Sequence, residues 1–397
     1  MRSPLAAFGL LSFTYFAAIG LFNPYAPLWF KELGFSTLAI GGIASLQSWT
    51  RVLAPYGWGW LGDHTGRRVD LIRLATAGCL VSALCLLFVE SLWPVAMVTA
   101  ALYLSNGAVV PLYEASLAHL LNTSKGLDTA RYGRVRVWGS VGFIVSVTAF
   151  GAALEQLGVR AFPWIVAAVN GLLLVSALSL PRGRKEAHHD QPPPPVLPLL
   201  RQPEVAWFFA SVFFTVLAHT VLYAFLSLYL VSLGFGKAAV GALWAVSVSV
   251  EIVFFWFQGR WFHRLSLHRW LAVVAAVTTL RFAATAGAGF LPWVLVLAQM
   301  SHAITFAAHH AACIAMIHRL FPGRLRGRGQ ALYSVLGYGV PGVIGGLGGG
   351  WVIDRFGFSP AFWCAAAAAG LAGLCVQRSA RAAGRRAGAA TGAPADA

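Results

Sequence analysis

The sequence predicts an all-α membrane protein with twelve transmembrane helices arranged as two pseudo-symmetric six-helix bundles. Three observations support this fold class. Hydrophobic residues make up 58% of the chain and charged residues only 11%, whereas soluble domains carry about 25% charged residues. Apolar stretches of membrane-spanning length recur along the 397 residues. Finally, the second half of the chain repeats the first.

The internal repeat is visible at a nearly constant offset. A shift of 200 positions places Leu33-Gly34-Phe35 on Leu233-Gly234-Phe235. A shift of 199 positions places Gly151, Glu155, Gly158 and Trp164 on Gly350, Asp354, Gly357 and Trp363. Matches in several separate stretches indicate a duplicated bundle, which is an architecture of alternating-access transporters.

The spans are expected to be helices, because hydrocarbon forces every backbone polar group to be satisfied internally. In the N-terminal bundle, residues 1–181, we expect spans at 5–30, 37–61, 70–89, 93–121, 135–157 and 162–181. In the C-terminal bundle, residues 204–378, we expect spans at 204–231, 238–258, 270–289, 292–318, 330–352 and 360–377. Residues 182–203, which contain the proline run 192–195, are expected to form a cytoplasmic linker. Residues 379–397 are expected to be a disordered cytoplasmic tail near anionic lipid.

The net charge of +16 follows the predicted topology. Most Lys and Arg residues fall on one side of the bilayer, and only Lys31, Arg160, Lys237 and Arg355 fall on the other. This asymmetry predicts that both termini are cytoplasmic, in the plasma (bacterial inner) membrane. The charge therefore needs no nucleic-acid partner. The five cysteines lie in apolar stretches without metal-ligand spacing, so we expect no metal, no cofactor and no disulfide framework.

Ionisable residues also lie inside the predicted spans, where each costs roughly 3 kcal/mol at a helix centre. They are Arg51, Glu114, Arg136, Glu251 and Arg281. We expect them to face the bundle interior in pairs. They could be structural ion pairs, but intramembrane charges more often mark a substrate or proton pathway, which is the interpretation we favour.

Polar side chains recur at helical spacing in three spans. Span four carries Tyr103, Asn106 and Glu114; span seven carries Thr215, His219 and Tyr223; span ten carries Gln299, His302 and His309, with His310 beside them. Such stripes can be interhelical hydrogen-bonding contacts. Because they occur in both halves, we expect them to line one hydrated central cavity.

The segment after span two contains Gly59, Asp63, Gly66, Arg67 and Arg68. It resembles the signature loop of the major facilitator superfamily, with His64 in place of the usual arginine. The resemblance implies a major facilitator fold. It also implies that this loop acts as a conformational latch on the cytoplasmic side.

Two further segments resemble the lactose permease family: Pro111 to Ala115, with Glu114, and Gly133 to Phe143, with Arg136. The sequence from Tyr132 and the pattern Gln299, His302, Thr305 and Phe306 resemble more closely the branch of phenylpropionate permeases and nucleoside symporters. The resemblance implies that Glu114 and Arg136 hold substrate. It also implies that Phe143 replaces a stacking Trp, and that Glu251, Arg281 and His302 form the coupling group. Sugar carriers have a Glu where this chain has Thr305, so the proton would be carried by Glu251, Glu114 or a histidine.

We therefore expect a proton-coupled symporter of a small organic solute rather than an enzyme. Arginine and aromatic side chains suit an aromatic carboxylate such as phenylpropionate, while a nucleoside or sugar stays open. The expected substrate-binding residues are Glu114, Arg136, Phe143, Trp138, Tyr15, Asn106, His219, Tyr223, His309 and His310. The expected partners are substrate, protons and lipid, and we expect a monomer. The alternatives are an exporter of amphipathic compounds and, more remotely, a membrane enzyme or receptor.

Overall fold

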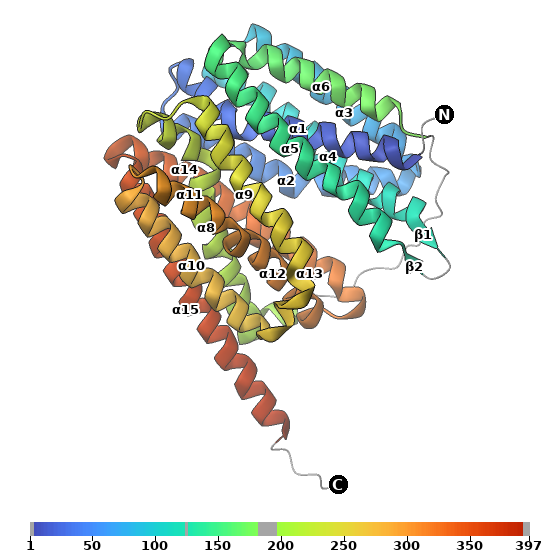
Figure 1. Ribbon diagram of the computed structural model, residues 1–397. Coiled ribbons are helices and arrows are strands. Elements are labelled where there is room, and N and C mark those ends of the chain that lie inside the picture. The colour runs from blue at the N-terminus through green and yellow to red at the C-terminus, as the bar shows by residue number, and fades with distance from the viewer. Residues whose placement is uncertain (1–3, 124–125, 182–196, 392–397) are drawn as a thin grey trace. The chain divides into compact units, whose positions relative to one another are not determined.

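The computed structural model describes residues 4–123, 126–181 and 197–391, and nearly all of them are helical (Figure 1). The first half contains α1 (Pro4–Glu32), α2 (Thr37–Thr65), α3 (Arg68–Cys85) with η1 (Leu86–Phe88), α4 (Leu92–Leu121), α5 (Thr129–Leu157), η2 (Val159–Ala161) and α6 (Phe162–Leu178). Each expected span coincides with one of these long helices. Between α4 and α5, the two-residue strands β1 (Asn122–Thr123) and β2 (Gly126–Leu127) pair antiparallel.

The second half follows the same order. It contains α7 (Leu197–Leu200), α8 (Pro203–Ser232), α9 (Lys237–Phe257), η3 (Gln258–Arg260), η4 (Phe262–Arg264), α10 (Leu267–Ala288), α11 (Pro292–Met300), η5 (Ala303–Ala308), α12 (His309–Leu320), η6 (Gly323–Leu325), α13 (Arg326–Leu332), η7 (Tyr333–Gly339), α14 (Val340–Phe356) and α15 (Phe358–Thr391). The π-helical segments η5 and η7 interrupt the expected spans ten and eleven. Such insertions are rare and often lie at functional sites.

Eleven helical segments within the described residues are long and apolar enough to cross a bilayer. Helix α2 stands where the second span is expected but is not among the eleven. Its middle carries polar residues such as Gln47, Ser48 and Thr50, which lower its hydropathy. The predicted fold class, an all-α membrane protein, is confirmed.

The chain divides into two compact units. The first comprises Met1–Asp190, Tyr223–Ser249 and Gly346–Arg355, and the second comprises Gln191–Leu222, Val250–Gly345 and Phe356–Ala397. This division differs from the expected boundary at the linker, because parts of α8, α9 and α14 pack within the first unit. Glycine permits that packing: a Cβ atom on Gly41 of α2 would lie 2.0 Å from the carbonyl oxygen of Gly346 in α14.

Two carboxylates of the first unit bind the N-termini of neighbouring helices. Asp354 of α14 accepts hydrogen bonds from the backbone amides of Thr37 and Leu38, both at 2.9 Å, and from the Thr37 hydroxyl. Glu155 of α5 likewise accepts from the backbone amide of Lys237 at the start of α9. The first amides of a helix lack intrahelical partners, so a carboxylate stabilises them. The repeat detected in the sequence relates Glu155 to Asp354, so the two contacts are equivalent.

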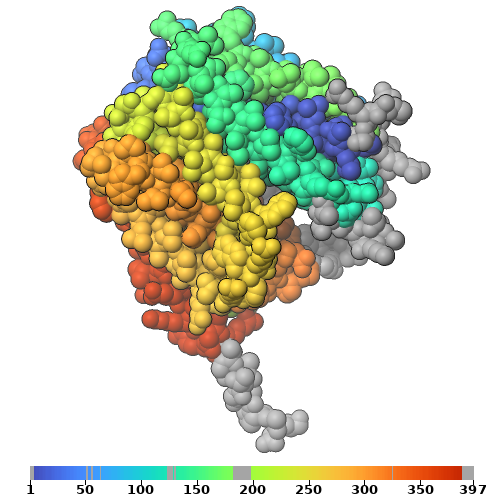
Figure 2. All heavy atoms as spheres, in the orientation of Figure 1, coloured from blue at the N-terminus to red at the C-terminus, as the bar shows by residue number. Residues whose placement is uncertain are grey.

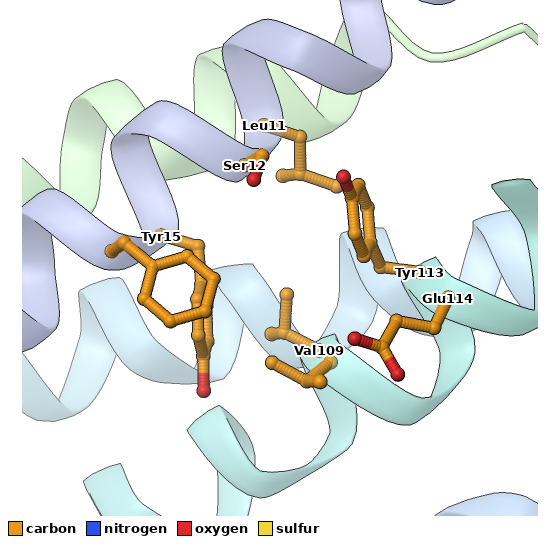
Figure 3. A pocket seen from close by; sticks show the side chains of 8 residues that line it. Leu11, Ser12, Tyr15, Val109, Tyr113 and Glu114 are labelled. Carbon is orange, nitrogen blue, oxygen red and sulfur yellow. The ribbon is translucent and has the colours of Figure 1, made fainter. Parts of the chain in front are cut away.

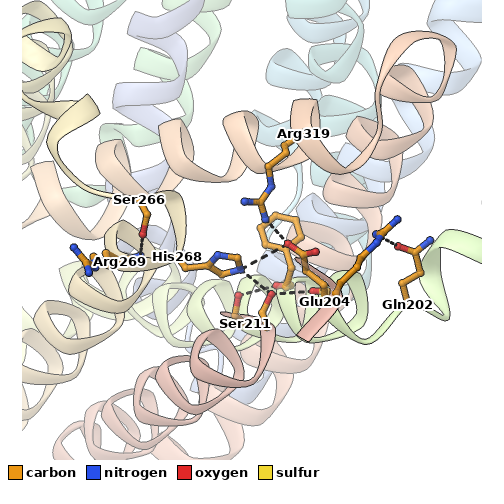
Figure 4. A network of polar contacts seen from close by, with 10 residues as sticks. Gln202, Glu204, Ser211, Ser266, His268, Arg269 and Arg319 are labelled. Carbon is orange, nitrogen blue, oxygen red and sulfur yellow. Dashed lines mark hydrogen bonds and ion pairs between the residues drawn. The ribbon is translucent and has the colours of Figure 1, made fainter. Parts of the chain in front are cut away.

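A polar network at the start of α8 connects helices of the second unit (Figure 4). The Glu204 side chain is 10% exposed and accepts a hydrogen bond from Arg319 of α12. His268 of α10 lies 3.2 Å from the Ser379 hydroxyl of α15, which donates to the Glu204 carbonyl at 2.9 Å. Through its carboxylate and its backbone carbonyl, Glu204 thereby links α8 with α12 and with α15, which also contacts α10.

Apolar side chains fill the interior of each unit. The core of the first unit includes Leu11, Ile72 and Leu117, and that of the second includes Phe208 and Phe321. The space-filling view shows neighbouring helices with their side chains in contact (Figure 2). The cores thus fix the helices that carry the polar side chains described below.

The C-terminal helix corrects one expectation. Disorder was expected from residue 379, but α15 continues to Thr391, and its last turns extend away from the other helices (Figure 1). Alanine and arginine are strong helix formers, which explains the continuation. Arg386 also donates to the Gln202 side chain at 2.7 Å. Residues 182–196 of the expected linker lie outside the described residues.

Candidate functional site

The first part of the candidate site is an ion pair between α4 and α5. Nε of Arg136 lies 3.7 Å from Oε1 of Glu114, and the two side chains are 37% and 40% exposed. The Arg136 guanidinium also lies over the Phe16 ring of α1, 4.4 Å from its centroid. The pair is therefore loose, partly open to solvent and flanked by an aromatic face.

A pocket adjoins this ion pair in the first unit (Figure 3). Helix α1 contributes Leu11, Ser12, Tyr15 and Phe16, helix α4 contributes Val109, Val110, Tyr113 and Glu114, and the enclosed space between them has a volume of only about 10 Å³. The Tyr15 hydroxyl donates to Asn106 Oδ1 at 3.0 Å. The structure therefore brings the expected residues Tyr15, Asn106, Glu114 and Arg136 together. Phe16 was not among the expected residues, because no motif marks it in the sequence.

The two aromatic residues expected on α5 lie on different faces of the helix. Phe143 is seven residues after Arg136, about two turns, and therefore shares its face. A Cβ atom on Gly20 of α1 would lie 3.2 Å from Phe143 Cδ2. Trp138 is only two residues from Arg136, which places it about 200° around the helix. Its side chain is 52% exposed, so the structure does not bring Trp138 to the pocket.

The second unit holds a buried chain of polar side chains around Arg281. Nη1 of Arg281 donates to His302 Nδ1 at 2.8 Å, and His302 Nε2 lies 2.9 Å from Glu251 Oε1. Arg281 is 4% exposed and His302 is equally shielded. The expected coupling residues Glu251, Arg281 and His302 are thus brought together from α9, α10 and the residue before η5.

The hydrogen bonds among Arg281, His302 and Glu251 determine which ring nitrogen of His302 carries a proton. A guanidinium can only donate, so Nδ1 of His302 must be the acceptor. The ring proton is then on Nε2, which donates to the Glu251 carboxylate. Protonating Nδ1 would place two donors face to face. His302 is therefore neutral in this arrangement, with its Nε2 proton directed at the Glu251 carboxylate.

Two uncharged groups also accept hydrogen bonds from Arg281. Its Nη1 donates to the Thr305 hydroxyl at 2.7 Å and its Nη2 donates to Gln299 Oε1 at 3.0 Å. Thr305, where sugar carriers have a Glu, is thus a neutral acceptor here. It lies in η5, where the wider turn changes the register of span ten. No pattern in the sequence predicts this π-helical segment.

The other histidines expected at the site, His219, His309 and His310, lie in the same unit. His219 of α8 packs edge-on to Phe282 and its ring centroid lies 6.3 Å from that of His302. His309 Nε2 lies 3.4 Å from the Cys313 sulfur, and His310 Nδ1 lies 3.4 Å from the Tyr333 hydroxyl in η7. Tyr223 of the first unit stacks on Trp244. The expected substrate-binding residues are therefore divided between the two units.

The expected signature loop is mostly helical. Helix α2 continues to Thr65, so Gly59 lies inside its last turns rather than in a turn of the loop. Gly66 ends the helix in the left-handed conformation, with φ of 63° and its amide bonded to the Gly62 carbonyl. Arg67 and Arg68 begin α3. The side chains of Arg51 and Asp63 lie outside the described residues, so the latch role stays a prediction.

Comparison with known proteins identifies the family. The MFS_1 like family matches residues 6–364. The chain belongs to this family. It is a transporter of the major facilitator superfamily and an integral membrane protein.

Individual relatives agree with this assignment. The chain is 28% identical over 343 residues to the probable 3-phenylpropionic acid transporter of Escherichia coli (strain K12), covering 82% of this chain and 85% of that protein. It is 25% identical over 356 residues to the maltose permease of Geobacillus stearothermophilus, covering 88% of each. The structure of a mutant of the nucleoside transporter NupG superposes with a TM-score of 0.85 at 16% identity, covering 95% of this chain and 100% of that chain. This structural likeness shows the fold alone.

Proposed function

We propose that this transporter is a proton-coupled symporter of a small organic carboxylate, with an aromatic acid such as 3-phenylpropionate as the favoured substrate. It would act by alternating access in a bacterial inner membrane, as a monomer with both termini in the cytoplasm. The observation that carries the proposal is the buried chain Arg281–His302–Glu251. Glu251 is the carboxylate of this buried chain, and it would be the group in the second unit that binds and releases a proton.

The substrate class follows from the surroundings of Arg136. A guanidinium binds a carboxylate through two parallel hydrogen bonds. The rings of Phe16, Tyr15 and Tyr113 lie beside this arginine or line the adjacent pocket. An arginine next to aromatic rings suits a ligand with an acid group and a planar ring. The Escherichia coli relative is a probable transporter of such a compound, 3-phenylpropionic acid.

Glu114 would link substrate binding to proton uptake at this site. Its carboxylate lies 3.7 Å from Arg136, so an anionic substrate must compete with it for the guanidinium. Protonation of Glu114 removes the competing negative charge and increases the affinity for substrate. By thermodynamic linkage, bound substrate then favours protonated Glu114 to the same extent. The loose geometry of the pair allows this exchange.

Glu251 would carry the transported proton in the second unit. When it is ionised, its charge is balanced by Arg281 through the neutral imidazole of His302. When it is protonated, the buried arginine is left without that balance, which is costly away from water. The protonated and ionised forms should therefore favour different conformations, as a symporter requires.

Two other substrate classes and one other direction stay open. The likeness to NupG allows a nucleoside, and the maltose permease allows a sugar. A sugar is disfavoured because Thr305 replaces the acid of sugar carriers. A proton-driven exporter of amphipathic compounds would use the same fold in the opposite direction.

Uptake into proteoliposomes tests the proposal. Labelled 3-phenylpropionate should accumulate when the outside is made acidic, and a protonophore should abolish the accumulation. Empty liposomes control for diffusion of the neutral acid across lipid. Accumulation that is indifferent to the pH gradient would refute proton coupling, and flux only in the outward direction would favour the exporter.

A further inference from the structure

A second pocket lies in the first unit, on the other side of the Tyr15–Asn106 hydrogen bond. Helix α1 contributes Ala18, Ile19, Phe22 and Asn23, helix α4 contributes Leu102, Tyr103 and Asn106, and α6 contributes Asn170; the enclosed space has a volume of about 20 Å³, enough for one small group such as a hydroxyl or a water. None of these side chains carries a formal charge at neutral pH. Each of the three helices thus contributes an asparagine to the pocket, beside apolar side chains and without an ion pair.

Asn170 gives this pocket an unused hydrogen-bond acceptor. Its side chain is 3% exposed and its Nδ2 donates to the Val166 carbonyl at 2.9 Å. A carbonyl can only accept, so the amide nitrogen must face Val166 and the orientation of the amide is fixed. Oδ1 of Asn170 then has no hydrogen-bond partner among the described residues. A buried acceptor left unpaired is costly, which indicates that a ligand donor or water satisfies it.

The two pockets are neighbours along the same pair of helices. Asn106, which lines the second pocket, is eight residues before Glu114, which lines the first, so the two lie about 12 Å apart along α4. Tyr15 lines the first pocket and donates to Asn106 of the second. A ligand with its acid group at Arg136 and a planar ring beyond it would direct the far end of the ring toward the asparagines.

We propose that the second pocket is a subsite for an uncharged hydroxyl group on the ring of the substrate. This inference rests on the proposed function and narrows it to hydroxylated aromatic carboxylates. A hydroxyl donates to Asn170 Oδ1 and can accept from an asparagine amide, so it matches the asparagines that line the pocket. A second charged group on the ring is excluded, because no lining side chain carries an opposite charge.

Equilibrium binding to the purified full-length protein tests the subsite. The ligands are 3-phenylpropionate and 3-(4-hydroxyphenyl)propionate, which differ by one hydroxyl. The variants are Asn170→Leu and, as a matched control, Asn122→Leu, which makes the same change at an exposed position between α4 and α5. The wild type should bind the hydroxylated acid about three- to tenfold more tightly, as one hydrogen bond predicts. Asn170→Leu should remove this preference and Asn122→Leu should keep it.

Each other outcome decides the question. A preference that survives Asn170→Leu, or that is absent from the wild type, would overturn the subsite and leave the pocket to water. If neither acid binds the wild type, the proposed carboxylate function fails, and 4-ethylphenol, which has the ring and the hydroxyl without the acid, tests the pocket alone. Its binding should weaken in Asn170→Leu, and equal or absent binding would overturn the subsite. If the leucine variant does not fold, Asn170→Ala removes the same oxygen without adding bulk.

Discussion

Replacement of Asp354 by asparagine should loosen the contact between α14 and the first turn of α2. The carboxylate accepts hydrogen bonds from two backbone amides and one hydroxyl. Asparagine keeps one acceptor oxygen but loses the other oxygen and the negative charge. One lost hydrogen bond costs about 0.5–1.5 kcal/mol, and a lost charge at a helix N-terminus costs about 0.3–1 kcal/mol. The contact should therefore weaken by about 1–2 kcal/mol, a factor of roughly 5–30 in its opening equilibrium.

Hydrogen exchange measured by mass spectrometry reports this opening directly. The amides of Thr37 and Leu38 are bonded to Asp354, so a peptide covering the start of α2 should exchange faster by that factor. Asp70→Asn is the matched control, because Asp70 is an exposed aspartate paired with Arg73 in α3. Unchanged exchange at the start of α2 in Asp354→Asn would show that the carboxylate does not hold this helix.

Four further substitutions test other parts of the structure. Glu155→Gln should accelerate exchange in the first turn of α9 by a similar factor and leave α2 unchanged; acceleration in both would contradict two separate contacts. In the wild type, affinity for 3-phenylpropionate should fall as rising pH ionises Glu114, so Glu114→Gln should raise affinity at pH 7 about fivefold or more and flatten the pH profile measured by calorimetry. Lost binding there would favour a sugar-like ligand. Arg136→Lys should weaken binding of the same acid at least about tenfold, since an ammonium cannot form the paired hydrogen bonds; wild-type affinity would place the ligand elsewhere. Glu204→Gln should lower the thermal midpoint by the equivalent of about 1–2 kcal/mol, less than for a fully buried pair because Arg319 is partly exposed; an unchanged midpoint would make that network dispensable.

The helices were predictable because hydrophobicity and length are local properties. The span expected at 204–231, for example, is α8 at Pro203–Ser232. The repeat was also visible, since the matches Glu155 with Asp354 and Gly34 with Gly234 need only the sequence. Their structural role was not predictable. A carboxylate that binds the end of a distant helix does so through backbone amides, which leave no mark in the sequence.

The candidate site shows the same limit. That Glu251, Arg281 and His302 come together followed from the cost of intramembrane charge and from the family resemblance. The order of these three side chains, with the imidazole between the guanidinium and the carboxylate, could be seen only in the structure. Trp138 was expected at the pocket because it is aromatic. It is two residues after Arg136, however, so the two side chains lie on opposite faces of the helix. The π-helical segment that carries Thr305 has no sequence pattern of its own.

The helix boundaries were wrong where glycine or alanine composition suggested loops. The second span was expected to end at residue 61, before Gly62, but α2 continues to Thr65 and ends at Gly66. The tail after residue 378 was expected to be disordered, but its alanines and arginines extend α15. In both places local helix propensity outweighed composition.

Proton movement driven by substrate tests the central claim most directly. Wild-type protein is reconstituted with a pH-sensitive dye inside liposomes of equal internal and external pH, and 3-phenylpropionate is added outside. The account predicts internal acidification beyond that of empty liposomes, and its loss in Glu251→Gln. Acidification that persists in Glu251→Gln would show that another group carries the proton. Substrate uptake by the wild type without any acidification would contradict proton-coupled symport itself.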